Sequence, residues 1–70
     1  MAATRVTNKL RAFSFNAGEM TQQQLADRSG LTRQTIIAIE QSKYAPSLEA
    51  AFRIARVFDA PLESGFGYDG

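Results

Sequence analysis

The sequence predicts an all-α fold of five short helices, with a short two-stranded antiparallel sheet formed by the two ends of the chain. Apolar residues recur at helical spacing, Ser and Thr stand where helices would begin, and Gly and Pro separate the segments. The chain of 70 residues suits one small domain, residues 1–70, and its 44% hydrophobic content is enough to form a core. Because so small a core leaves stability marginal, dimerisation is an obvious further source of stability.

The first two helices are predicted from apolar spacing and from their end signals. The first covers residues 8–17, and Gly18 is well placed to end it. Its buried stripe is predicted to be Leu10, Phe13 and Ala17. The second helix begins after Thr21, which together with Gln24 matches a capping box, and Gly30 ends it.

The third and fourth helices each follow a hydroxyl residue that can cap them. Thr32 precedes a helix predicted over residues 33–41, in which Ile36 and Ile39 are spaced to bury against the other helices. Ser47 precedes the fourth helix. The spacing of apolar residues predicts that the central core stripe of the fourth helix consists of Leu48, Ala51, Phe52, Ala55 and Phe58.

The two ends of the chain are predicted to meet. Residues 61–63 start a final helical turn, and residues 4–7 and 66–68 are β-prone enough to form a strand pair. An apolar dimer surface is expected near this end of the chain, because the predicted core stripe leaves such residues unused. Its candidate residues are Val57, Phe66 and Tyr68. Local packing within the chain is nearly as good an explanation for all three.

Composition excludes several classes of function. The chain has no Cys and no His, which removes disulfides, the usual zinc ligands and the commonest general base. Asp27, Glu40 and Glu49 show no paired spacing, and no nucleophile stands beside a base, so no catalytic residue, metal ligand or cofactor is expected. No long apolar run indicates export or membrane insertion, and a cytoplasmic protein is expected.

Charge is distributed unevenly although the net charge is only +1. Through Lys43 the chain carries six basic and three acidic residues, and after it two basic and four acidic residues. A basic first half suits a protein that meets an anion with one end only. Ordinary scatter of surface charge is the alternative explanation.

Residues 21–41 form the pattern of a helix-turn-helix, in which two capped helices flank a glycine turn and the second helix enters the major groove of DNA. With Ile36 and Ile39 inward, the outward side chains are those of Gln34, Ile37, Ala38 and Gln41, with Arg33 at the edge. Arg can pair with guanine, Gln with adenine, and an apolar side chain can contact the thymine methyl group. The residues predicted to contact bases are Arg33, Gln34 and Ile37. The alternative is that they are ordinary surface residues of a small helical bundle.

Contacts to DNA phosphates are expected on both sides of this helix. Thr21 and Gln22 stand at a helix N-terminus, where free backbone N–H groups and the helix dipole favour a phosphate oxygen. Thr32 is a further candidate at the start of the next helix. Lys43 and Tyr44 in the following loop can reach a second phosphate, although Tyr44 fits a half-buried position against the fourth helix equally well.

Residues 21–46, TQQQLADRSGLTRQTIIAIEQSKYAP, strongly resemble the Cro/C1-type (XRE) family of helix-turn-helix regulators from bacteria and phages. The continuation PSLEAAFRIARVFDAPLES is similar to the compact single-domain branch that includes the cytolysin repressor. The resemblance implies five helices, a strand pair from the termini, a homodimer, and binding to an inverted-repeat operator in double-stranded DNA. It also implies that Gln22, Gln41 and Lys43 lie near phosphates, and that Arg33, Gln34 and Ile37 face the bases. It implies no small-molecule ligand and no membrane partner.

The sequence departs from the family pattern at four positions. Ser14 stands where an arginine usually pairs with the acid matching Glu40, so the partner of this partly inward carboxylate is open, and Arg11 is one candidate. Ser42 replaces the usual Gly or Asn at a left-handed helix exit, Glu19 is an extra residue, and Gly65 replaces an apolar residue.

A transcriptional repressor is the function that these observations favour. The main alternative is a protein-interaction module, such as an antitoxin whose helix-turn-helix domain serves a protein partner. Antitoxins of this kind commonly carry an additional toxin-binding segment, and none is visible after Asp69. An enzyme is the least favoured class.

Overall fold

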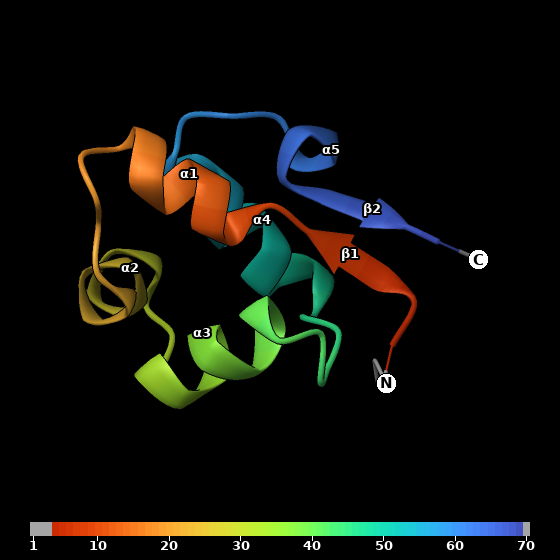
Figure 1. Ribbon diagram of the computed structural model, residues 1–70. Helices are drawn as coiled ribbons and strands as arrows, with labels where there is room; N and C mark the ends of the chain where they lie inside the picture. The colour runs from red at the N-terminus through yellow and green to blue at the C-terminus, as the bar shows by residue number, and fades with distance from the viewer. Residues whose placement is uncertain (1–3, 70) are drawn as a thin grey trace.

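The computed structural model describes residues 4–69 of the chain. The elements in this range are β1 (Val6–Asn8), α1 (Leu10–Asn16), α2 (Gln22–Ser29), α3 (Arg33–Glu40), α4 (Leu48–Val57), α5 (Leu62–Gly65) and β2 (Phe66–Tyr68). Five helices and one two-stranded sheet confirm the predicted fold class for the described residues. The helices gather around one core, and the sheet lies to one side of them, where both ends of the chain emerge (Figure 1). Within residues 4–69, no helix has the length and apolar character that a membrane span requires.

Helix α2 begins and ends at the predicted residues. The Thr21 hydroxyl accepts a hydrogen bond from the Gln24 backbone N–H at 3.0 Å, and the Gln24 side chain accepts one from the Thr21 N–H at 2.9 Å. This reciprocal pair is the predicted capping box. Gly30 ends the helix with a left-handed φ of 75°, a conformation that glycine adopts without steric cost.

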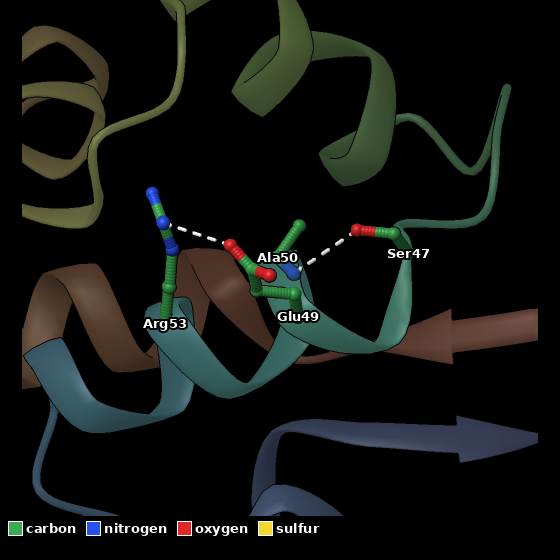
Figure 2. Close-up of polar contacts among 4 residues, drawn as sticks. All are labelled: Ser47, Glu49, Ala50 and Arg53. Atoms are coloured by element: carbon green, nitrogen blue, oxygen red, sulfur yellow. Dashed lines mark hydrogen bonds and ion pairs between the residues drawn. The ribbon is translucent and has the colours of Figure 1, made fainter.

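Helices α3 and α4 are capped in a simpler way, by one hydroxyl each. The Thr32 hydroxyl accepts from the Thr35 N–H, and the Ser47 hydroxyl accepts from the Ala50 N–H, both at 3.1 Å. Figure 2 shows the Ser47 cap at the start of α4. Such a hydroxyl satisfies a backbone donor that has no partner inside the helix. Thr32 and Ser47 are therefore the N-caps, and both predicted helix starts are confirmed.

One core cluster joins the first four helices. Ile36 and Ile39 of α3 are almost completely buried, as predicted. The cluster consists of Leu10, Met20, Leu25, Ala26, Ile36, Ile39 and Ile54. Since these side chains come from α1, α2, α3, α4 and the loop after α1, the cluster fixes α3 against the rest of the domain.

The predicted core stripe of α4 is wrong at Leu48 and Phe52, whereas Ala51 and Ala55 are buried and Phe58 packs against the core as predicted. Leu48 is 67% exposed and Phe52 is 48% exposed, and Phe58 is half-buried. The buried residues of α4 are Ala50, Ala51, Ile54 and Ala55. Three of these are alanines, which let α4 approach its neighbours closely, and the helix is oriented so that Leu48 and Phe52 face outward.

Helix α1 is shorter than predicted. It ends at Asn16, and Ala17 forms its C-cap with φ −91° and ψ 26°. Ala17 is therefore exposed, and its predicted place on the buried stripe is wrong because it lies beyond the last helical residue. Gly18, at φ 83°, takes the left-handed conformation expected at the end of this helix.

The ends of the chain pair as predicted. The strand β1 begins two residues later and ends one residue later than the predicted range of 4–7. Val6 is opposite Tyr68 in the antiparallel register, and the Lys9 N–H donates to the Gly65 carbonyl at 2.9 Å. Gly65 is buried, and a Cβ at this position would lie 3.0 Å from Cε2 of Phe13. Glycine at position 65 therefore makes room for the Phe13 ring.

Candidate nucleic-acid interface

Helix α3 lies at the edge of the molecule, with α2 packed beside it (Figure 1). Ile36 and Ile39 hold its inner side in the core, and the polar residues of its outer side are exposed to solvent. Arg33 and Gln34 at the start of the helix are exposed, as is Gln41 at its C-cap. The structure therefore brings the predicted polar residues together on one open surface.

The apolar part of this surface is less open than the polar part. Ile37 and Ala38 are half-buried rather than fully outward. A half-buried isoleucine between exposed polar side chains still offers a methyl group to a ligand, and its remaining area contributes to packing. Ile37 is therefore less accessible than Arg33 and Gln34.

The start of α2 carries the first set of predicted phosphate contacts. The capping box satisfies the Thr21 and Gln24 N–H groups, and the other backbone N–H groups of the first turn lack an intrahelical acceptor. Gln22 is half-buried, and its side-chain Nε2 donates to Oε1 of Glu40 at 2.7 Å. The Thr21 hydroxyl accepts a hydrogen bond in the cap, which leaves its O–H as a donor. The donors of this turn are therefore the Thr21 hydroxyl, the Gln22 side chain and the free backbone N–H groups.

Glu40 has a partner other than the one considered from the sequence. Its carboxylate accepts from Gln22, and no ion pair joins it to Arg11 in the described part of the chain. Arg11, Ser14 and Glu40 line the same surface hollow, which lies between α1, the start of α2 and the end of α3. Within the described residues, the partner shown for the Glu40 carboxylate is the Gln22 amide. Sequence reasoning missed this pair, since it joins residues on two different helices.

The second set of predicted phosphate contacts lies after α3. Lys43 is exposed, and the Tyr44 side chain is 45% exposed, which leaves both predicted positions of Tyr44 open. The chain turns here through Ser42, whose φ of 55° confirms the predicted left-handed exit from α3. Thr32, at the other end of α3, is exposed, but its hydroxyl already binds the Thr35 N–H and hydroxyl. Lys43 is thus an exposed cation in the loop that follows α3.

The predicted dimer residues differ in how much surface they offer. Tyr68 is 74% exposed, whereas Val57 and Phe66 are partly buried and pack against the core. Two further exposed apolar residues, Leu48 and Phe52, lie one turn apart on the outer side of α4. The sequence predicts that both lie in the core. Phe15, on α1, is a further exposed aromatic residue.

The charges near α4 form a separate surface. Arg53 and Glu49 form an ion pair with a 2.8 Å separation, one helical turn apart on the outside of α4 (Figure 2). Arg28 and Arg56 line a shallow hollow with Arg53 beside the turn at Gly30. Among residues 4–69, no group of acidic side chains is placed to hold a metal ion.

Comparison with known proteins identifies the family. A family model described as helix-turn-helix matches residues 16–64. An uncharacterized HTH-type transcriptional regulator of Archaeoglobus fulgidus is 46% identical over 61 residues, covering 87% of this chain and 86% of that protein. A protein of the same description from Methanocaldococcus jannaschii is 52% identical over 50 residues, covering 71% and 76% of the two chains. One from Bacillus subtilis is 37% identical over 59 residues, covering 84% and 88%.

The matched segment spans the capped helices, the turn at Gly30 and the exposed side of α3. The family comprises transcriptional regulators rather than enzymes. The chain belongs to the helix-turn-helix family of Cro/C1-type transcriptional regulators.

Proposed function

We propose that this protein binds an inverted-repeat operator in double-stranded DNA as a homodimer and represses transcription. Each copy places α3 in the major groove, and the two copies occupy successive grooves about 34 Å apart. The observation that carries the proposal is the open outer side of α3, which presents Arg33 and Gln34 while two buried isoleucines anchor the helix from behind. The one acidic residue of α3 is Glu40, its last residue, which accepts a hydrogen bond from Gln22.

The roles of individual residues follow from their positions. Arg33, Gln34 and Ile37 contact base edges and select the sequence. Phosphate contacts on the two sides of the groove fix the position of α3 but carry no sequence information. The residues proposed for these contacts are Thr21, Gln22, Thr32, Gln41, Lys43 and Tyr44.

The dimer is proposed because the core is small and apolar side chains remain exposed on one chain. Tyr68 has the largest exposed fraction of the three predicted dimer residues, and Val57 and Phe66 are partly buried against the core. Sedimentation equilibrium of Tyr68→Ser should show a weakened dimer, whereas Phe15→Ser on α1 should leave it unchanged. A dimer that resists Tyr68→Ser but separates with Phe52→Ser would move the interface to α4.

Selection from a random-sequence duplex library tests DNA recognition directly. We expect enrichment of an inverted repeat whose half-sites are separated by about one helical turn. The measured affinity should fall linearly with salt on logarithmic axes, with a slope of about −0.9 for each phosphate contact. Binding that enriches no sequence, or that is insensitive to salt, would instead favour a role in protein interaction.

A further inference from the structure

The hydrogen bond between Gln22 and Glu40 joins the first residue of α2 to the last residue of α3. The Gln22 Nε2 lies 2.7 Å from Oε1 of Glu40, and both residues are half-buried. A hydrogen bond to a carboxylate is shorter and stronger than one between neutral groups. This contact therefore spans the helix-turn-helix and holds the Gln22 side chain in one place.

A carboxylate also determines which way the amide of Gln22 lies. A glutamine amide has a donor side and an acceptor side that are nearly identical in shape, so either side can face a neutral partner. The Glu40 carboxylate only accepts hydrogen bonds, so the atom that faces it must be the amide nitrogen. Glu40 thus selects one of the two orientations of the Gln22 amide.

This orientation leaves one N–H of the amide available. The nitrogen carries two N–H groups, and one of them is used by Glu40. In residues 4–69 the structure shows no acceptor for the second N–H. Gln22 is the first residue of α2, and backbone N–H groups of the same turn also lack an intrahelical partner. Donors grouped at a helix N-terminus favour a phosphate oxygen, whereas the opposite orientation would bring the amide oxygen toward that anion.

We propose that Glu40 is a positioning residue for DNA binding, which holds the Gln22 amide so that its second N–H donates to a phosphate oxygen. The inference rests on the proposed function and adds to it the residue that orients one phosphate contact. Simple electrostatics predicts the opposite effect, because a carboxylate near DNA repels phosphate. If Glu40 positions Gln22, the loss of DNA affinity caused by Gln22→Ala depends on whether Glu40 is present. If Glu40 only repels phosphate, the effects of the two substitutions on affinity add independently.

A double-mutant cycle on the full chain tests the proposal. The variants are Gln22→Ala, Glu40→Gln and the double variant, and the probe is a fluorescein-labelled mixed-sequence duplex of 24 base pairs at low salt. We expect Gln22→Ala to weaken binding about tenfold in the wild type, the value for one hydrogen bond to a charged group. In the Glu40→Gln background the same change should cost less than about twofold, because the amide is no longer oriented.

The chain offers a matched control on the same helix. Gln23 Nε2 donates to Oδ1 of Asp27 at 2.9 Å, and this exposed pair is the same combination of amide and carboxylate. The cycle of Gln23→Ala and Asp27→Asn should show no coupling in DNA binding. Thermal unfolding of each variant separates effects on the fold from effects on binding.

Nitrogen-15 NMR of the wild type gives a second measurement that needs no variant. The two Nε2 protons of Gln22 should be well separated, and addition of the duplex should shift the proton that Glu40 does not bind. In Glu40→Gln this separation should decrease. Unchanged Gln22 side-chain signals in the saturated complex would overturn the proposal, as would an equal cost of Gln22→Ala in both backgrounds. If the wild type binds no duplex, DNA binding itself fails, and this failure appears before any variant is compared.

Discussion

Helices α3 and α4 are both short and amphipathic, but they contact the core with side chains of different size. Helix α3 inserts Ile36 and Ile39, whereas α4 contributes mainly alanines and one large residue, Ile54. The difference appears on the outer sides as well. The outside of α3 carries polar side chains that can contact a ligand, and the outside of α4 carries the bulky Leu48 and Phe52. The size of a side chain therefore does not indicate which side of a short helix is buried.

The largest expected effect concerns Ile54 and Phe52, two bulky residues of α4 that differ in burial. Ile54 is completely buried and Phe52 is 48% exposed, although they are only two positions apart. Ile54→Ala should lower the free energy of unfolding by about 2–5 kcal/mol because it leaves a cavity. Phe52→Ala should cost less than about 1 kcal/mol. Urea denaturation measures both, and a greater loss at Phe52 would restore the stripe predicted from the sequence.

The helix starts and the inner side of α3 could be predicted because they depend on local chemistry. Thr21, Thr32 and Ser47 cap the helices that follow them, and a cap needs only a hydroxyl and the backbone within three residues. Ile36 and Ile39 of α3 are three positions apart and form its buried stripe, as their helical spacing predicted. These features place the helix-turn-helix before any tertiary contact is known.

The orientation of α4 and the partner of Glu40 could not be predicted from local chemistry. In α4, the stripe through Leu48 and Phe52 and the stripe through Ile54 both have helical spacing. Only packing against α2 and the core selects between them. The Gln22 and Glu40 side chains are 18 positions apart, and they meet because α2 and α3 fold side by side. Both features therefore depend on how the helices assemble.

The second prediction concerns the outer side of α3. Gln34→Ala should weaken binding of the selected operator by about 1–3 kcal/mol and relax selectivity at one base pair. Lys43→Ala is the matched comparison, because it should weaken binding to all sequences alike and reduce the salt slope by about 1. Fluorescence anisotropy with the operator and a scrambled duplex measures both. Selectivity that survives Gln34→Ala would show that α3 does not contact the bases through this residue.

The third prediction concerns the turn between α2 and α3 at Gly30. Gly30 has a φ of 75°, and a Cβ there would lie 2.9 Å from Nη1 of Arg53 on α4. Gly30→Ala should cost about 1–2 kcal/mol, chiefly from the left-handed backbone, because the end of the Arg53 side chain can move aside. The double variant with Arg53→Ala, measured by urea denaturation, separates the two causes. If Arg53→Ala recovered most of the loss, crowding rather than backbone conformation would be the cause.

The smallest expected effect concerns the ion pair on the outside of α4. The Glu49 and Arg53 side chains are 75% and 50% exposed and 2.8 Å apart, one turn from each other in the favourable order along the helix. Glu49→Gln should lower the free energy of unfolding by only about 0.5 kcal/mol, including its interaction with the helix dipole. Urea denaturation at 0.05 M salt should show this loss, and at about 1 M salt screening should remove most of it. A loss several times larger that persists in salt would mean that the outer side of α4 stabilises the domain as the inner side of α3 does.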